Sequence, residues 1–188
     1  MSETEYDVIV AGYGPVGETC ANLLGYYGIK ALILDKEKNT YPLPRAITWD
    51  AECQRAMSHC EFLSEVKTRK IRGVDNKDAN KKSIMKITME GFDTYNYQHR
   101  ILFIHQPQFD EAHRENAKKY PTNTIKTGSE LLAVDEVNGI INCTYKNVDT
   151  DEKFTVKSKY LLACDGANST VRKLNGIKLN SLDADESW

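Results

Sequence analysis

A strand-like segment, a glycine-rich turn and a helical segment follow one another at the start of the chain and constrain its fold most strongly. Residues 6–11 (YDVIVA) form a continuous apolar run of the kind found in buried parallel strands. The turn after this run carries Gly12, Gly14 and Gly17 in the spacing G-x-G-x-x-G. A second apolar run, Ala31–Leu34, completes a strand–helix–strand unit of about 30 residues. Because such a unit requires a right-handed crossover between parallel strands, we expect an α/β fold with a Rossmann-like parallel sheet.

The helix expected between these strands carries apolar residues at helical spacing. They fall on one face of a helix, which is the pattern of a helix that packs against a sheet. A glycine at position 28 provides a natural stop just beyond them. The residues of this face are Val16, Cys20, Leu23, Leu24 and Tyr27.

The middle of the chain alternates helical, polar and strand-like segments. Apolar or small residues at helical spacing predict a helix over Thr48–Val66. Lys67–Lys86 contains eight Lys or Arg residues against two Asp, and we interpret this segment as a solvated excursion. Ile101–Ile104 is a short strand-like run. A proline suits the first turn of a helix, so the next helix is expected over Pro107–Lys119.

The periodicity changes in the last third of the chain, where an antiparallel β-meander is expected over about residues 130–160. Leu131–Val137 and Ile140–Lys146 flank an Asn-Gly pair, and this pair supplies the positive φ angles of a two-residue type I′ hairpin turn. A further turn over 147–152 leads into a third strand, Phe154–Cys164, which ends in an apolar run.

Composition excludes several classes of partner. With 188 residues the chain is long enough for one large domain or two small ones. The 25 Lys and Arg residues against 27 Asp and Glu give a formal charge of −2, which is no basis for nucleic-acid binding. No apolar run approaches the roughly 18 residues of a membrane span, and the acidic start lacks the apolar core of a secretory signal. We therefore expect a cytoplasmic protein with no nucleic-acid or membrane partner.

The cysteines and histidines show no metal-site spacing. The five cysteines are odd in number and contain no C-x-x-C pair, which favours reduced thiols over a disulfide framework. We expect Cys53 and Cys60 to be buried apolar thiols rather than metal ligands. The four histidines lack H-x-x-x-H spacing, and we expect no metal.

The glycine turn indicates a dinucleotide site. Gly12 permits the tight turn, Gly14 allows the backbone to approach a pyrophosphate, and Gly17 allows the helix to pack closely on the strand. Asp35 ends the second strand 18 residues later, where a carboxylate can accept hydrogen bonds from a ribose. The alternative is a βα turn that uses glycine without binding phosphate. The glycine motif does not separate FAD from NAD, because both contain an ADP half.

Four motifs, in this order, carry a more specific signal. Together they resemble the class A flavoprotein aromatic hydroxylases, the p-hydroxybenzoate hydroxylase superfamily, and within it the phenol hydroxylase and 3-(3-hydroxyphenyl)propionate hydroxylase-like enzymes. The resemblance covers essentially the whole chain and is weakest over 67–100. The motifs are GYGPVGETCANLLGYYGIKALILDKE (12–37), YPLPRAITWDAE (41–52), IHQPQFDEAHRE (104–115) and CDGANSTVRK (164–173).

The resemblance implies which residues contact FAD. The first motif would hold the pyrophosphate, and Asp35 would take the adenosine ribose, although the family usually has Glu followed by Arg where this chain has Asp35-Lys36. Arg45 matches an arginine that approaches the FAD, and Gln106 matches a glutamine near the ribityl and phosphate region. The Asp-Gly motif after the last strand matches one that serves FAD and nicotinamide cofactor binding. The implied cofactor-binding residues are Gly12, Gly14, Val16, Gly17, Asp35, Lys36, Arg45, Gln106, Asp165 and Gly166.

The resemblance also implies an activity. It is that of an FAD-dependent monooxygenase that consumes NADH or NADPH and O₂ and hydroxylates a small phenolic substrate. We expect residues 1–188 to form an incomplete FAD-binding domain, because the family's second Asp-bearing motif and its substrate domain have no counterpart here; the catalytic residues are unassigned. Two alternatives remain open: a flavin-binding fragment without catalysis, and an NAD(P)-binding reductase. A homo-oligomer of a full-length form is compatible with the sequence, but no feature specifies one.

Overall fold

A six-stranded mixed sheet forms the centre of the protein. The structure is a computed structural model that describes residues 5–60, 66–89, 93–94, 98–99 and 101–180. The strand order is β10-β2-β1-β13-β12-β11; the first four strands run parallel, and the last three form the antiparallel meander. The expected α/β fold is confirmed. The strands are β1 (Tyr6–Ala11), β2 (Ala31–Asp35), β10 (Asn123–Thr127), β11 (Ser129–Val137), β12 (Ile140–Asn147) and β13 (Lys153–Ala163).

The meander is continuous with the parallel sheet instead of being a separate insertion. Strand β13 pairs with β12 on one side and in parallel with β1 on the other, with Val8 opposite Tyr160. The hairpin turn between β11 and β12 has the predicted geometry, since Asn138 and Gly139 have φ values of 54° and 75°. Strand β10 was not expected, because its sequence, NTIKT, is mostly polar.

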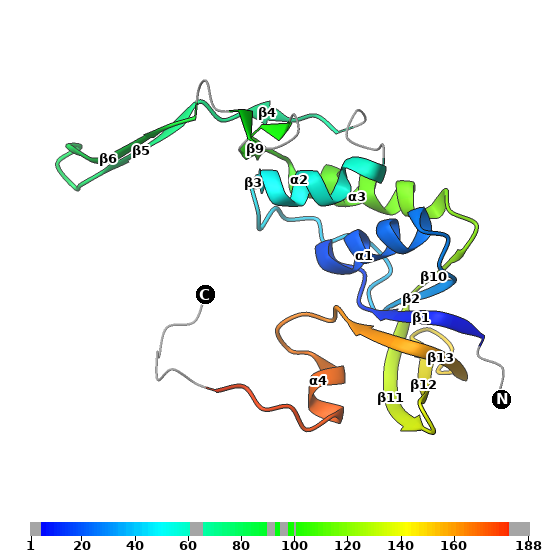
Figure 1. Ribbon diagram of the computed structural model, residues 1–188. Coiled ribbons are helices and arrows are strands. Elements are labelled where there is room, and N and C mark those ends of the chain that lie inside the picture. Colours follow the sequence, from blue (N-terminus) through cyan, green and yellow to red (C-terminus); the bar gives the residue numbers. More distant parts are fainter. Residues whose placement is uncertain (1–4, 61–65, 90–92, 95–97, 100, 181–188) are drawn as a thin grey trace.

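The two faces of the sheet are covered by different elements (Figure 1). Helices α1 (Pro15–Tyr26) and α3 (Gln106–Lys118) lie on one side, and strands β11 and β12 curl beneath the other. Alternate residues of β1 and β2 therefore enter two separate cores, as expected for strands buried on both faces. The helix-side core contains Val8, Val10, Ala31, Ile33 and Ala117; the other contains Ile9, Leu32, Leu34, Cys143, Tyr145 and Val156.

The buried face of α1 differs in part from the predicted one. Cys20, Leu23 and Leu24 pack, partly buried, against apolar cores as predicted. Two members of the predicted apolar face are largely exposed: Val16 is 64 % exposed and Tyr27 is 65 % exposed. The reason is that α1 is packed between the sheet and α3, so close approach on two sides favours small side chains over large ones. The segment that follows α3 also approaches closely: a Cβ atom at Gly25 would lie 2.4 Å from the ring of Tyr120. The buried residues of α1 are Gly17, Glu18, Ala21, Asn22 and Gly25.

The helix expected over 48–66 is shorter and begins later. Thr48–Asp50 is strand β3, paired with β9 (Ile101–Phe103), and helix α2 covers only Ala51–Met57 before the 3-10 turn Ser58–Cys60. Asp50 is both the last residue of β3 and the N-cap of α2. Its carboxylate stabilises the start of the helix by accepting a hydrogen bond from the N–H of Cys53 at 2.8 Å. The rest of the expected helix falls at 61–65, outside the described residues, and at Val66, which is not helical.

A third core lies under the far side of α3. It contains Trp49, Met57, Cys60, Leu102 and Phe109. Cys60 is buried as predicted, but the prediction for Cys53 was wrong: its side chain is exposed on the solvent side of α2.

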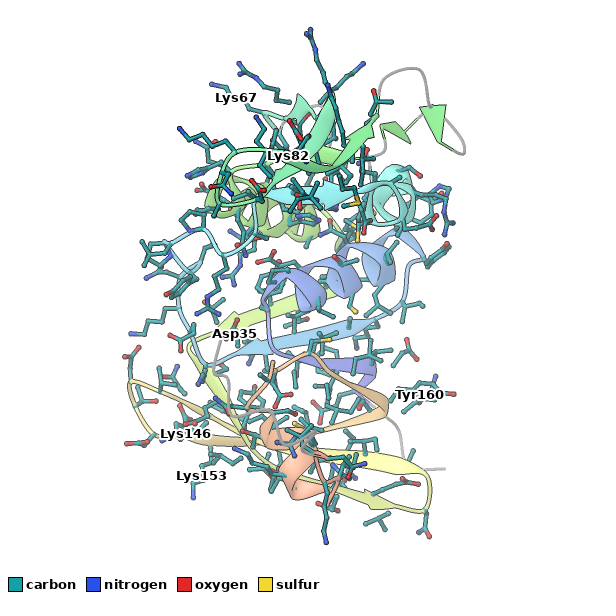
Figure 2. All side chains as sticks on the ribbon, turned by 90° about the vertical axis from the view of Figure 1, so that its left-hand side faces the viewer. Asp35, Lys67, Lys82, Lys146, Lys153 and Tyr160 are labelled. Carbon is teal, nitrogen blue, oxygen red and sulfur yellow. The ribbon has the colours of Figure 1, made fainter. Side chains whose placement is uncertain are left out.

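The basic segment 67–86 is solvent-exposed as predicted, but it contains strands that were not. Strand β4 is Arg69–Lys70, and β5 (Gly73–Lys77) and β6 (Ser83–Thr88) form a hairpin that projects from the body (Figure 1). Figure 2 shows Lys67 and Lys82 at this end of the molecule, opposite Lys146 and Lys153 of the meander. Two further short strands, β7 (Asp93–Thr94) and β8 (Gln98–His99), pair with each other in antiparallel orientation. Among the described helices, none is long and apolar enough to cross a membrane.

Candidate functional site: the glycine turn and the carboxyl ends of the parallel strands

The three glycines of the turn have different surroundings. Gly12 has a φ of +97°, and a Cβ atom there would lie 2.3 Å from the carbonyl oxygen of Cys164. A Cβ atom at Gly17 would lie 1.9 Å from the carbonyl oxygen of Gly12. A Cβ atom at Gly14, in contrast, would meet no described atom within 4 Å. Gly12 and Gly17 are therefore required by the packing of the chain on itself, whereas Gly14 leaves open space for a ligand to reach the backbone.

The N-terminus of α1 has the features that favour anion binding. Gly14 is the N-cap residue and provides no side chain to satisfy the first amides, and Pro15 occupies the first turn without an N–H of its own. The helix dipole adds partial positive charge at this end. Val16, which the resemblance assigned to the pyrophosphate, lies exposed on the same turn.

Asp35 is linked to the glycine turn. Its Oδ2 atom accepts a hydrogen bond from the N–H of Tyr13 at 3.0 Å, and its Oδ1 atom accepts one from the N–H of Glu37 at 3.0 Å. A carboxylate has about four acceptor positions, so Asp35 keeps acceptor capacity for a ligand hydroxyl. The same carboxylate therefore both fixes the turn and remains available to the adjacent space.

A cavity of about 130 Å³ brings together four of the predicted residues. It opens where β1, β2 and β13 end, at the edge where ligands bind in open α/β sheets. Gly12, Asp35, Lys36 and Asp165 contribute to its wall. The remaining wall residues are Ala11, Leu34, Ser129, Glu130, Leu131, Asn168 and Thr170, none of which the sequence singled out.

Asp165 organises the segment after β13. Its carboxylate accepts hydrogen bonds from the Ser169 hydroxyl at 2.5 Å and from the N–H groups of Thr170 and Val171 at 2.6 and 3.1 Å. It therefore caps helix α4 (Thr170–Leu174) and shapes the turn through Gly166, which has a φ of +79°. The Arg172 guanidinium, on the same helix, donates to the carbonyl of Ile177 at 3.0 Å.

Gln106 and Arg45 meet away from this cavity. The Gln106 Oε1 atom accepts hydrogen bonds from the N–H groups of Arg45 and Ala46, both at 2.7 Å. The Arg45 side chain is exposed, and its guanidinium lies 4.0 Å from the centre of the Tyr41 ring. Gln106 therefore fixes the backbone of the loop that carries Arg45, leaving the guanidinium at the surface.

A buried polar cluster behind the turn was missed from the sequence. Arg114 of α3 donates to the Glu18 carboxyl at 2.7 Å and to the carbonyl of Tyr13. Burial raises the pKa of Glu18 to about 8, a larger effect than the opposing one of Arg114. Tyr13 is also buried, and burial raises the pKa of its phenol. No local signal marks this cluster, because Glu18 and Arg114 are 96 residues apart.

A larger, more open hollow of about 480 Å³ lies on the other side of Arg114. None of the predicted cofactor residues lines it. Its wall includes Tyr13, Lys38, Asn39, Thr40, Glu111 and Lys118. Across the described part of the chain, no group of three or more His, Cys, Asp or Glu side chains is placed to hold a metal ion.

Comparisons with known proteins show the family to which the chain belongs. A family model described as "FAD binding domain" matches residues 5–188. The 3-(3-hydroxy-phenyl)propionate/3-hydroxycinnamic acid hydroxylase of Comamonas testosteroni is 29 % identical over 189 residues, covering 100 % of this chain and 32 % of that protein. The enzyme of the same name from Escherichia coli O139:H28 is 30 % identical over 186 residues, with 96 % and 32 % covered. The chain thus spans about a third of the length of these relatives.

Solved structures share the fold. The p-nitrophenol 4-monooxygenase PnpA of Pseudomonas putida DLL-E4 superposes with a TM-score of 0.83 at 24 % identity, over 93 % of this chain and 44 % of that one. The flavin-dependent monooxygenase PieE, solved with FAD and substrate, gives a TM-score of 0.74 at 17 % identity, over 93 % and 33 %. The match of the family model to nearly the whole chain confirms the resemblance noted in the sequence. The chain belongs to the FAD-binding domain family of the flavoprotein aromatic hydroxylases.

Proposed function

We propose that the glycine turn and the adjoining cavity bind FAD. The observation that carries this proposal is the contrast at the glycines: Gly12 and Gly17 are enclosed by the chain's own backbone, whereas the space at Gly14 is open. In this proposal the N–H groups at the start of α1 receive the pyrophosphate. The cavity beside Asp35 and Asp165 receives the adenosine half of FAD.

The chain's own residues would then have distinct roles. Asp35 accepts from the ribose with the capacity left after its bonds to Tyr13 and Glu37, and Lys36 adds positive charge at the cavity wall. Gln106 holds the 45–46 backbone so that the exposed Arg45 guanidinium can reach the anionic cofactor. Asp165 shapes the turn through Gly166 and need not contact the cofactor itself, since its carboxylate already caps α4.

We further propose that the chain is the cofactor-binding part of an NADH- or NADPH-consuming monooxygenase that hydroxylates a small phenolic substrate with O₂. Support comes from the hydroxylase names of the relatives, each about three times as long as the aligned region. When bound, FAD supplies the electron and oxygen transfer. Residues 1–188 would serve as the FAD-binding domain of a cytoplasmic enzyme, and the substrate contacts would come from regions outside this chain.

An absorbance spectrum of the purified protein, before and after added FAD and desalting, tests the proposal. Retained flavin absorbance with an intact FAD released on denaturation supports it. A colourless protein that binds NADH and not FAD would instead favour the reductase alternative. Assaying NADH and NADPH oxidation with simple phenols then separates catalysis from flavin binding alone.

A further inference from the structure

Two cysteines distant in sequence face each other beside the glycine turn. Cys20 lies on α1, Cys164 directly follows β13, and their Sγ atoms are 4.0 Å apart. Both side chains are half-buried against the helix-side core. The proposed cofactor site uses neither thiol.

The backbone holds this pair together. The N–H of Cys164 donates to the carbonyl of Ala11 at 2.7 Å, which fixes the residue against the end of β1. At Gly17, one turn before Cys20, a Cβ atom would lie 3.5 Å from the Cβ of Cys164. Helix α1 therefore passes close to Cys164, and a disulfide of about 2.05 Å requires the sulfurs to approach by roughly 2 Å. Side-chain rotation with a small shift of α1 can supply that movement.

The surroundings distinguish Cys20 from the other cysteines. The two sulfurs share a hydrogen bond in which either atom can be the donor; this contact lowers the pKa of Cys20 to about 7 and raises the pKa of Cys164. Burial raises the pKa of Cys143 to about 12, and burial also raises the pKa of Cys53 and of Cys60. Because the thiolate is the nucleophile, Cys20 is the cysteine best prepared to react with an electrophilic oxidant.

We propose that Cys20 and Cys164 form an oxidant-sensitive dithiol site that hydrogen peroxide converts to a disulfide. In the first step the Cys20 thiolate attacks one peroxide oxygen, the O–O bond breaks, and a sulfenic acid and hydroxide form. In the second step the Cys164 sulfur attacks the Cys20 sulfur, an S–S bond forms, and the sulfenic oxygen leaves as water with the thiol proton. Peroxide is the only oxidant consumed, and two thiols lose two electrons and two protons in total.

The bridge would join α1 to the end of β13 across the glycine turn. Residues 12–17 connect Ala11, whose carbonyl accepts a hydrogen bond from Cys164, to the part of α1 that carries Cys20. The backbone of Gly12 also packs on the Cys164 carbonyl. The state of the dithiol and the shape of the turn are therefore mechanically connected.

Peptide mapping by mass spectrometry tests the proposal on the whole chain without cofactor, so the result does not depend on FAD binding. The protein is treated with hydrogen peroxide, alkylated and digested without reductant. The expected product is a Cys20–Cys164 cross-linked peptide that dithiothreitol removes. In Cys164→Ser, a 1,3-diketone probe should label the sulfenic acid at Cys20; in Cys20→Ser, both signals should be lost.

Cys53→Ser is the matched control, because Cys53 is the more exposed thiol on the neighbouring helix α2. This variant should give the cross-link in the same yield as the parent protein. Oxidation confined to Cys53, a cross-link between other cysteines, or no modification of Cys20 would overturn the proposal. Mapping of the unsubstituted protein gives this answer even where a serine variant does not fold.

Discussion

The Nε atom of Arg114 lies 2.7 Å from the Oε1 atom of Glu18, and this contact joins α3 to α1 directly behind the glycine turn. The two side chains are only 11 % and 1 % exposed. The same guanidinium contacts the Tyr13 carbonyl and lies 3.6 Å from Asp35, so one buried cation ties the turn to the end of β2. The geometry of the proposed cofactor site therefore depends on a residue outside it.

Replacing Arg114 with methionine should destabilise the protein. The buried Glu18 carboxyl would lose its donor, which costs about 1–3 kcal/mol at pH 7 for a neutral buried group. The double variant Glu18→Leu/Arg114→Met should recover at least half of the loss, because replacing both partners with apolar groups removes the unsatisfied polar atom. Urea unfolding measures both variants. Equal stability of the parent protein and Arg114→Met would show that this contact contributes nothing.

The contribution of Glu18 to the stability of the protein should fall as pH rises from 6.5 to 8. Burial raises the pKa of Glu18 from its ordinary value of 4.5 to about 8, so the folded protein keeps this proton in a range where the unfolded chain has released it. The contribution is complete below about pH 4.5 and is lost as pH rises through 8. His113 does not interfere above pH 6.5, because burial lowers its pKa from 6.5 to about 4 and its contribution is lost only on acidification. Cys20, whose pKa is lowered from 9.0 to about 7, adds stability as pH rises through this range, so the effect of Glu18 is measured as a difference between two proteins that both contain Cys20.

Thermal melting of the parent protein and of Glu18→Gln at pH 6.5, 7.2 and 8 tests this prediction. Glutamine keeps an acceptor for Arg114 but cannot titrate, so the melting temperature of Glu18→Gln should rise relative to that of the parent protein as pH increases over this range. The same pH dependence in both proteins would assign the effect to another group.

Valine substitutions at Gly14 and at Gly17 should have different effects: the first should weaken FAD binding, and the second should prevent folding. Gly14→Val should leave the fold intact, since the backbone there has a φ of −87° and open space, but it should lower FAD affinity by at least tenfold by filling the approach to the pyrophosphate. Gly17→Val should unfold the protein, because its side chain would overlap the Gly12 carbonyl. Circular dichroism and fluorescence titration with FAD distinguish the two. Full FAD affinity in a folded Gly14→Val protein would contradict the assignment of the pyrophosphate to the glycine turn.

Leucine at Gln106 should loosen the loop that carries Arg45. It removes the acceptor of two backbone N–H groups, so we expect FAD affinity to fall severalfold and trypsin to cleave after Arg45 more readily. Gln108→Leu is the matched control, because Gln108 lies exposed on the same turn of α3. Identical affinities and cleavage rates for the two variants would contradict the role assigned to Gln106.

The parts of the fold with a local sequence pattern were the parts that could be predicted. The strand, glycine turn and helix over residues 6–26 and the hairpin at Asn138-Gly139 depend on neighbours in sequence, and both were placed correctly. The buried face of α1 was predicted only in part: Cys20, Leu23 and Leu24 pack against the apolar cores, but the fully buried positions are the small or polar residues that close packing on α3 allows. Strand β10 forms because it pairs in parallel with β2, and its polar sequence gives no local pattern from which a strand could be predicted.

The same limit applies to the candidate site. Gly12, Asp35 and Asp165 could be proposed because each ends or follows an apolar strand. Glu18 and Arg114 could not, since each is an ordinary charged residue on a helix until folding buries both. The capping role of Asp165 likewise depends on the turn that follows it, which the Asp-Gly motif alone did not reveal.

A ¹H–¹⁵N correlation spectrum of the protein during titration with FAD tests most directly whether the glycine turn binds the cofactor. We expect saturable shifts in the amides of the glycine turn and of the cavity wall, at residues 12–14, 16–17, 35–36, 129–131 and 165–170, and in Gly14→Val the same shifts should require at least tenfold more FAD. The amides that line the larger hollow, at 38–40 and 111–118, should move little. Saturable shifts confined to that hollow, or no saturable shift with FAD at all, would contradict the assignment of the cofactor to the glycine turn.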